Sequence, residues 1–347
     1  MLWVGGLGGM EIELVERVGI RFEGIPAAGL HGVGMLKMLR NFAAMVSGIE
    51  ASIRILRRFQ PDVMLFTGGY VAVPVAIGAW LSASKHRRPR SLLFVPDVEP
   101  GLAIKFVSRF ITQIAVVNEQ SRNYFSPRLA VTVTGYPTRQ DLRQWDRRSA
   151  QQALGLSSDL PTLLVFGGSK GARSINRTLL KVLAQLLEES QVIHVSGYLD
   201  WEEVQKAREG LEPMKAIRYH AFPYLHEEMG AALAAADLVL SRAGAATLGE
   251  YPLFGLPAIL VPYPYAWRYQ YRNAHFLEER GAAVILKDQD LAEKFLPLVR
   301  ELIRDQSRRE KMGQAMRSLA CVEAANQIAN LLIALAGEKP AKEVELW

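Results

Sequence analysis

The chain has 347 residues, of which 50% are hydrophobic and 22% are charged. This length is typical of two ordinary domains, and the composition excludes a chain that is disordered throughout. The net charge of +6 suits anionic ligands such as nucleotides, or an anionic membrane surface. Nucleic acid is not expected, because no zinc-finger, aromatic-stacking or basic-stripe pattern accompanies this charge.

The single cysteine, Cys321, excludes a disulfide framework within the chain and favours a reducing cytoplasm. No apolar run reaches the roughly 18 residues of a membrane span, so no transmembrane helix is expected. The first residues also lack the basic and apolar regions of a signal peptide.

Short apolar runs alternate with amphipathic segments through the first part of the chain, which predicts parallel strands with helices on both faces of the sheet. The expected strands are 2–5, 19–25, 63–66, 91–95, 114–117 and 131–134, and the expected helices are 10–17, 35–59, 71–81 and 100–110.

A second unit of the same plan follows, so the sequence predicts two doubly wound units in tandem. Its expected strands are 163–166, 191–195, 217–222, 238–240, 258–261 and 284–285, and its main helices are 145–154, 175–187, 290–305 and 307–336. The charged tail after Gly337 is expected to fray.

The glycine-rich segment Gly167–Ala172 follows a predicted strand and opens a predicted helix. Backbone N–H groups in such a turn can face an anion, and Ser169 adds a hydroxyl donor. The segment matches neither the Walker loop nor the dinucleotide G-x-G-x-x-G pattern. A tight turn without any ligand remains the alternative.

A second candidate site lies between Leu238 and Asn273, where a buried strand leads through the turn Ser241–Gly244 into a helix. A helix that begins at the carboxyl end of a parallel strand directs free N–H groups at a diphosphate. Glu250 is expected about one turn inside this helix, where a carboxylate can accept hydrogen bonds from a ribose. The alternative is an ordinary strand-turn-helix with a surface glutamate.

Four motifs together resemble one family. In chain order they are Thr67–Tyr70, Gly167–Ala172, Ser241–Glu250 and Gln270–Ala274. Their order and spacing are similar to the MurG family, the bacterial transferases of glycosyltransferase family 28 that make lipid II. The resemblance extends from Trp3 to about Ala334.

The resemblance implies a GT-B fold, an α/β architecture in which two Rossmann-like, doubly wound domains face each other across a cleft. Residues 1–138 would form the acceptor and membrane-facing domain, and residues 139–316 the domain that holds the UDP-sugar donor. Residues 317–347 would supply a C-terminal helix that packs back on the first domain, followed by the tail.

The resemblance also implies which residues contact the donor, UDP-N-acetylglucosamine. Ser169 would contact the diphosphate, Arg139 would neutralise it, and Glu250 would bind the ribose. Gln270 and Asn273 would contact the sugar hydroxyls. The backbone donors to the phosphates would be Gly244, Ala245, Ala246, Thr247, Leu248 and Gly249. On the acceptor side the candidates are Asp97 and Tyr70. No cofactor is implied, and the histidines show no metal-ligand spacing.

Two departures from the family concern the acceptor side. The family's opening strand, glycine-rich loop and helix have no counterpart, and Met1 aligns with the family's second strand. The family's His-Glu-Gln-Asn is here Phe94-Val95-Pro96-Asp97. A late gene start would explain only the first departure; a different acceptor or lost activity would explain both. The general base is unassigned, with Asp97, Glu99 and His31 as candidates.

The resemblance implies an inverting hexosyltransferase that moves N-acetylglucosamine from UDP-GlcNAc to undecaprenyl-diphospho-muramoyl-pentapeptide, the conversion of lipid I to lipid II in peptidoglycan synthesis. It would act as a peripheral protein on the cytoplasmic side of the cell membrane, alongside other cell-wall enzymes. Three alternatives stay open: a transferase with another lipid acceptor, a non-catalytic UDP-sugar-binding homologue, and a UDP-sugar epimerase.

Membrane contact also has a basis in the residues. Basic side chains flank the apolar stripe of the predicted helix 35–59, and a basic loop follows at 85–90. Such a surface can dock on anionic lipid. The alternative is that the stripe is ordinary core and the basic residues are simply solvated.

Overall fold

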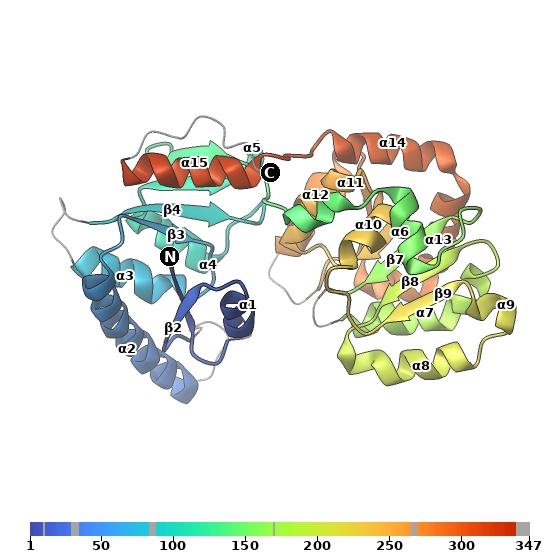
Figure 1. Ribbon diagram of the computed structural model, residues 1–347, viewed down its shortest axis with the longest axis horizontal. Coiled ribbons are helices and arrows are strands. Elements are labelled where there is room, and N and C mark those ends of the chain that lie inside the picture. The colour runs from blue at the N-terminus through green and yellow to red at the C-terminus, as the bar shows by residue number, and fades with distance from the viewer. Residues whose placement is uncertain (10, 29–34, 83–87, 169–170, 265–268, 338–347) are drawn as a thin grey trace. The chain divides into compact units, whose positions relative to one another are not determined.

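The computed structural model describes residues 1–9, 11–28, 35–82, 88–168, 171–264 and 269–337. The chain divides into two compact units (Figure 1). Unit 1 comprises residues 1–96, 100–134 and 326 to the C-terminus, and unit 2 comprises residues 97–99 and 135–325. Three residues of the turn that begins at Asp97 therefore group with unit 2, apart from their neighbours in sequence.

Unit 1 contains two parallel sheets. One pairs β1 (Leu2–Gly6) with β2 (Arg21–Ile25). The other has the order β3 (Val63–Phe66), β4 (Arg90–Val95), β5 (Gln113–Val116) and β6 (Ala130–Val133). Among the described residues, β1 pairs only with β2 and β3 pairs only with β4, so β1 and β3 are edge strands of their sheets. Apolar side chains stay exposed there, 37% for Trp3 and 44% for Leu65.

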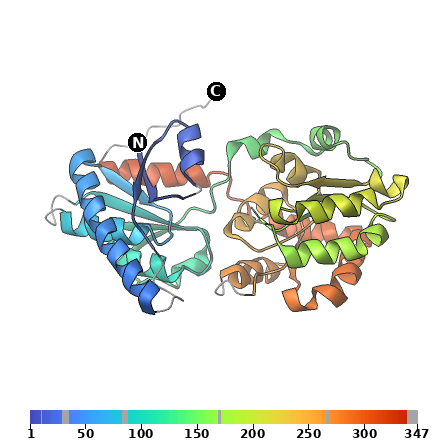
Figure 2. The ribbon, with the colours of Figure 1, turned by 90° about the horizontal axis from the view of Figure 1, so that it is seen from below.

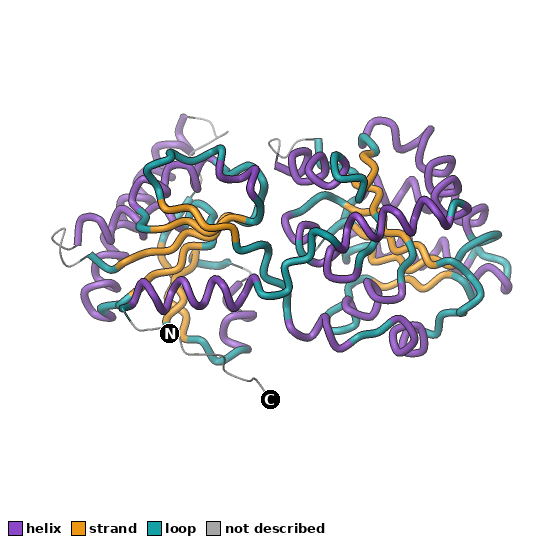
Figure 3. The backbone as a smooth tube through the Cα atoms, turned by 90° about the horizontal axis from the view of Figure 1, so that it is seen from above, coloured by secondary structure: helices purple, strands orange, loops and turns teal. Residues whose placement is uncertain are grey.

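The helices of unit 1 pack around these sheets, as Figures 2 and 3 show. They are α1 (Glu11–Arg17), α2 (Met35–Phe59), α3 (Ala72–Ser82), α4 (Leu102–Val107), the 3₁₀ turn η2 (Ser108–Phe110), α5 (Glu119–Arg122) and nearly all of α15 (Ala324–Ala336). The core of the four-stranded sheet joins Leu93, Val95 and Ile114 to Ile104 and Val107 of α4.

Unit 2 holds one six-stranded parallel sheet in the order β12-β11-β10-β7-β8-β9. The strands are β7 (Thr162–Phe166), β8 (Gln191–Val195), β9 (Tyr219–Phe222), β10 (Leu238–Ser241), β11 (Ala258–Leu260) and β12 (Ala283–Ile285). This is the doubly wound Rossmann order, and it reverses direction between β7 and β10. Ligands of such sheets bind at the carboxyl ends of the strands beside that reversal.

Helices cover both faces of this sheet (Figure 3). They are α6 (Arg147–Leu154), α7 (Arg173–Leu186), α8 (Trp201–Glu209), α9 (Pro213–Ala216), α10 (Met229–Ala235), α11 (Glu250–Phe254), α12 (Tyr269–Glu278), α13 (Leu291–Arg304) and α14 (Gln306–Arg317). The 3₁₀ turns are η3 (Gln140–Gln144), η4 (Tyr198–Asp200), η5 (Ala245–Leu248) and η6 (Asp288–Asp290). A core cluster of unit 2 packs α7, α8 and α13 against the strands, with Leu179, Val204 and Phe295 almost fully buried.

One predicted helix is wrong. The segment 307–336 forms two helices, α14 and α15, with a break at residues 318–323. The cause lies in tertiary packing, because Cys321 in the break lies against Gly135. A Cβ on Gly135 would come within 2.3 Å of the Cys321 Cβ, and Gly135 itself has a φ of +78°. Only glycine is compatible with this close approach.

Candidate functional site

A cavity of about 910 Å³ opens at the carboxyl ends of β7 and β10 in unit 2. It therefore lies at the point where the strand order reverses, the usual ligand position in this architecture. Its wall is formed by the glycine turn after β7, the turn after β10, the start of α7, and residues that follow β8, β11 and β12.

The glycine turn after β7 lets the backbone lie directly against the cavity. Gly168 and Gly171 have φ values of +85° and +75°. A Cβ on Gly171 would lie 2.2 Å from the backbone oxygen of Ser196, so a side chain at this position would collide with the backbone beyond β8. Ser169, predicted to contact the diphosphate, lies outside the described residues.

Arg242 is the first residue after β10, and its guanidinium group is held on the cavity wall. It lies 2.5 Å from Asp288 and donates a hydrogen bond of 2.8 Å to Ser174 Oγ. Ser174 in turn donates to Asp288 at 2.8 Å. The Arg242 side chain is only 10% exposed. A buried arginine with planar donors is suited to binding phosphate oxygens.

Arg173, the first residue of α7, is a second cationic group on the wall. Its Nε donates to Asp200 Oδ1 at 2.9 Å. Asp200 Oδ2 accepts a hydrogen bond of 2.8 Å from Asn176 Nδ2, which also donates to Ser196 O. The chain of contacts continues from Asn176 Oδ1 to His194 Nε2, and from His194 Nδ1 to the Tyr219 hydroxyl.

Burial lowers the pKa of His194 to about 3, although the nearby Asp200 carboxylate opposes this change. The imidazole is therefore neutral at physiological pH, and one ring nitrogen donates while the other accepts. This network connects the interior of the sheet to the Arg173 side chain on the cavity wall.

The turn after β10 differs from its prediction. Residues 245–248 form the 3₁₀ turn η5, and Glu250 begins a separate short helix, α11, after Gly249. The prediction of Glu250 one turn inside a single helix was therefore wrong. The break follows from tertiary packing, because a Cβ on Gly249 would lie 2.6 Å from Tyr136 Cδ1.

Glu250 nevertheless lines the cavity. Burial raises the pKa of its carboxyl group, the positive charge of Arg139 lowers it, and Asp141 raises it. Arg139 lies 3.4 Å from Asp141. Arg139 is thus close enough to act electrostatically on Glu250, although it does not itself line the cavity.

Gln270 and Asn273, both on α12, have different positions. Gln270 lines the cavity, and its Oε1 accepts a hydrogen bond from the Tyr263 backbone at 2.9 Å. Asn273 is fully buried and does not line the cavity. Its amide accepts from Val98 N and donates to Asp97 Oδ1 and to Ala243 O. Contact of Asn273 with a sugar hydroxyl stays a prediction, and it would require one of these bonds to open.

The structure brings only part of the predicted set to the cavity. The predicted residues that line it are Gly244, Ala246, Thr247, Glu250 and Gln270. Those of the same unit that do not line it are Ala245, Leu248, Gly249, Arg139, Asn273 and Asp97. Tyr70 belongs to unit 1 and is 51% exposed. His31, a candidate base, lies outside the described residues.

Apart from Glu250, sequence reasoning missed the charged residues of the wall and the serine bonded to two of them: Arg173, Asp200, Arg242, Asp288 and Ser174. The sequence did contain a signal for Arg242, a charged residue directly after a buried strand at the edge where ligands bind. The sequence contained no such signal for Asp288, because it orients Arg242 through contacts with Arg242 and Ser174, which are far from it in sequence.

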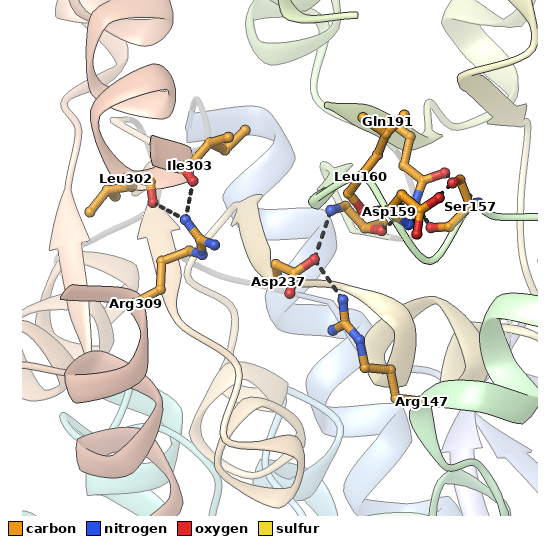
Figure 4. Close-up of polar contacts among 10 residues, drawn as sticks. Arg147, Ser157, Asp159, Leu160, Gln191, Asp237, Leu302, Ile303 and Arg309 are labelled. Carbon is orange, nitrogen blue, oxygen red and sulfur yellow. Dashed lines mark hydrogen bonds and ion pairs between the residues drawn. The ribbon is translucent and has the colours of Figure 1, made fainter. Parts of the chain in front are cut away.

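A second cavity of about 950 Å³ lies at the opposite, amino edge of the same sheet. Figure 4 shows that its polar groups have structural partners. Asp237 accepts hydrogen bonds of 2.8 Å from Arg147 and from the backbone N–H of Thr162, where β7 begins. Arg309 donates to the carbonyl groups of Leu302 and Ile303 near the end of α13. Arg147 is therefore the ion-pair partner of Asp237, and Arg309 binds the carbonyl groups of a helix end.

The described residues hold neither a metal centre nor a membrane span. No group of three or more His, Cys, Asp or Glu side chains in that part of the chain is arranged to hold a metal ion. No helix within the same residues has both the length and the apolar character needed to cross a bilayer.

Two Rossmann-like domains of parallel strands, one with a cavity at its topological switch point, are the architecture of the GT-B glycosyltransferases. Residues 2–116 match the glycosyltransferase family 28 N-terminal domain, and residues 162–330 match the corresponding C-terminal domain. The chain belongs to glycosyltransferase family 28. This confirms the family, the fold class and the enzyme class predicted from the motifs.

The relatives agree on one activity. A protein of Roseiflexus sp. (strain RS-1) is 39% identical, and the match covers 95% of this chain and 82% of that protein. A protein of Desulforamulus reducens is 35% identical over 94% of this chain and 88% of its own length. Both are described as UDP-N-acetylglucosamine–N-acetylmuramyl-(pentapeptide) pyrophosphoryl-undecaprenol N-acetylglucosamine transferase.

Solved structures support the fold. The crystal structure of Acinetobacter baumannii MurG is similar with a TM-score of 0.72 at 24% identity, covering 96% of this chain and 90% of that one. UDP-GlcNAc 2-epimerase from Neisseria meningitidis, solved with UDP-GlcNAc bound, has a TM-score of 0.66 at 14% identity, covering 93% and 88%.

Proposed function

We propose that this protein transfers N-acetylglucosamine from UDP-GlcNAc to a membrane-bound, polyprenyl-diphosphate-linked muramoyl-pentapeptide, converting lipid I to lipid II. The observation that carries the proposal is the cavity of unit 2, where Glu250 and two arginines meet at the switch point. Relatives that match over nearly the whole chain and bear the name of this transferase support it.

The donor would bind with its diphosphate toward Arg242 and Arg173, and with its ribose toward Glu250. Both guanidinium groups are oriented by carboxylates, so they require little reorganisation when charge develops on the departing UDP. Gln270 would bind a hydroxyl group of the transferred sugar. Direct attack by the acceptor hydroxyl on the anomeric carbon would then give inversion.

The test is transfer of radiolabelled N-acetylglucosamine from UDP-GlcNAc to a lipid I analogue with a shortened polyprenyl chain. We expect labelled disaccharide product and stoichiometric UDP. Donor binding without turnover would contradict the proposal and support the binding-only homologue. Conversion of UDP-GlcNAc without an acceptor would instead indicate an epimerase.

Membrane attachment would use an exposed aromatic patch on unit 1, defined by Trp80, Leu81, Leu102 and Phe106. These side chains are 46%, 54%, 51% and 38% exposed, and they belong to α3 and α4. Phe110 joins them, with ring centroids 6.2 Å from Trp80 and 5.4 Å from Phe106. Apolar side chains exposed together in this way are typical of an interaction surface.

Basic side chains accompany the aromatic patch. The Arg88 guanidinium lies 4.9 Å from the centre of the Trp80 ring. Lys105 and Arg109 are carried by α4 and by the turn that follows it. An apolar surface with adjacent cations fits the headgroup region of an anionic bilayer, where each basic residue contributes about 1 kcal/mol.

We expect the protein to sediment with phosphatidylglycerol vesicles, and salt to weaken this binding. The double variant Trp80→Ala/Phe106→Ala should weaken it by about 100-fold or more, because burial of each large aromatic side chain contributes about 1.5–3 kcal/mol. The matched control is Phe42→Ala on α2, which removes another exposed aromatic, 59% exposed. Equal losses for both variants would contradict the aromatic patch as the docking surface.

A further inference from the structure

Asp97 is held in unit 2 by a hydrogen bond from the buried amide of Asn273. The Asn273 Nδ2 atom donates to Asp97 Oδ1 at 2.8 Å, and Asn273 Oδ1 accepts from the backbone N–H of Val98 at 3.0 Å. One buried side chain therefore fixes both the carboxylate and the backbone of this turn. Glu99 follows two residues after Asp97. Its Oε2 atom lies 3.3 Å from Nε of Arg272, which belongs to α12, the helix that also carries Asn273.

The same amide connects Asp97 to the donor cavity. Asn273 Nδ2 also donates to the carbonyl oxygen of Ala243 at 3.2 Å. Together with the 2.8 Å bond to Asp97, this distance places the Asp97 Oδ1 atom no more than about 6 Å from the Ala243 oxygen. Gly244, the next residue, lines the cavity. Asp97 is therefore connected, through one amide group, to the residue that precedes the cavity-lining Gly244.

Tyr136 provides independent support for this proximity. Burial raises the pKa of its phenol to about 12, with further contributions from the negative charges of Glu250 and Asp97. Both carboxylates are thus close enough to act electrostatically on one phenol. Glu250 belongs to the cavity wall, so Asp97 and the donor site share this part of unit 2.

We propose that Asp97 is the general base of the transfer reaction. This inference rests on the proposed function and adds to it the residue that accepts the proton. The oxygen of the acceptor hydroxyl forms a bond to the anomeric carbon of N-acetylglucosamine, and its proton passes to the Asp97 carboxylate. The bond from that carbon to the β-phosphate oxygen breaks, and its electron pair leaves with UDP. Asp97 then releases the proton to solvent.

The electrostatics around Asp97 are consistent with this role. Burial raises the pKa of its carboxyl group, and the hydrogen bond from Asn273 opposes the rise. A carboxylate with a raised pKa is a stronger base than an exposed aspartate. Tyr136 is close enough to interact electrostatically with Asp97. Glu99 of the same turn is paired with Arg272 of α12, and Glu250 of α11 also acts on Tyr136. Asn273 would act as a positioning residue.

The decisive variant is Asp97→Asn, because an asparagine oxygen can still accept the Asn273 hydrogen bond but cannot take a proton. We expect kcat to fall by about 10²- to 10⁴-fold, the usual contribution of a general base. The affinity for UDP-GlcNAc and the melting temperature should stay close to those of the wild type. The matched control is Asp141→Asn, which neutralises another carboxylate of unit 2, paired with Arg139 and outside the cavity wall, and should change kcat by less than about threefold.

The outcomes separate the two proposals. If the wild type shows no transfer, the proposed function fails. If the wild type is active and Asp97→Asn keeps more than a tenth of its kcat, only the base assignment is overturned. Equal losses in Asp97→Asn and Asp141→Asn would also overturn it, because they would show a general effect of charge.

A pH profile keeps the inference testable if Asp97→Asn does not fold. For the wild type at saturating donor, kcat/KM for the acceptor should fall on the acid side as one group protonates, at a pH above the ordinary aspartate value. The variant Asp97→Glu should retain this acid limb at a shifted pH. Rates that do not fall as the pH is lowered to the ordinary pKa of an aspartate would contradict a carboxylate base.

Discussion

Replacing Glu250 with alanine is expected to weaken UDP-GlcNAc binding by about 10- to 150-fold without destabilising unit 2. Hydrogen bonds to a charged partner contribute about 1.5–3 kcal/mol, which corresponds to this range of affinity. Burial raises the pKa of Glu250, so the folded state disfavours its charged form. Removing this carboxylate should therefore leave the free energy of unfolding of unit 2 unchanged or increase it. Titration calorimetry with UDP-GlcNAc and thermal unfolding would measure both quantities.

The matched control is Asp141→Asn, which removes the other carboxylate near Arg139 without touching the cavity wall. Its donor affinity should stay within about twofold of the wild type, since an exposed ion pair contributes little. A Glu250→Ala variant that binds UDP-GlcNAc normally would show that this carboxylate does not recognise the donor. A large loss of stability would instead assign Glu250 a structural role.

Acidification is expected to destabilise unit 2 through His194 by about 1.4 kcal/mol per pH unit. The pKa of His194 is about 3 in the folded protein, whereas the ordinary pKa of an exposed imidazole is 6.5. The unfolded chain therefore binds the proton first. The stabilisation by neutral His194 is fully present above pH 6.5 and is lost as the pH falls from 6.5 toward 3.

This loss can be measured as the free energy of unfolding of unit 2 between pH 7 and pH 4, with the unit identified as the transition that UDP shifts upward. A His194→Gln variant should be less stable at pH 7, because its contacts with Tyr219 and Asn176 are disturbed. The slope of its free energy of unfolding against pH should be smaller by the contribution of one bound proton. An unchanged slope in that variant would contradict the assignment. The same network orients Arg173, so donor affinity should weaken with it.

The fold class followed from local patterns that survive in the structure. Buried parallel strands read as continuous apolar runs, and glycine turns mark their carboxyl ends. Gly168, Gly171 and Gly244 could therefore be placed beside a ligand from the sequence, and the structure locates them on one cavity wall. The strand-turn-helix pattern also indicated Glu250, the family resemblance added Gln270, and both line the same wall.

The errors share a cause. The helix expected to carry Glu250 is broken at Gly249, where Tyr136 packs, and the helix expected over 307–336 is broken where Cys321 meets Gly135. In both places a contact between residues far apart in sequence overrides a local helical preference. No pattern within either segment encodes its distant partner.

The sequence by itself determined the succession of strands and helices, the glycine turns and the family, because these depend on periodicity and on residues that are neighbours along the chain. Only the tertiary structure decided which polar groups share the cavity and which are tied to other side chains. Arg242 forms an ion pair with Asp288, and Arg173 forms one with Asp200. Asn273 donates hydrogen bonds to Asp97 and to the carbonyl oxygen of Ala243. The energy of a buried polar group depends on partners that folding brings within hydrogen-bond distance, and chain separation does not predict those partners.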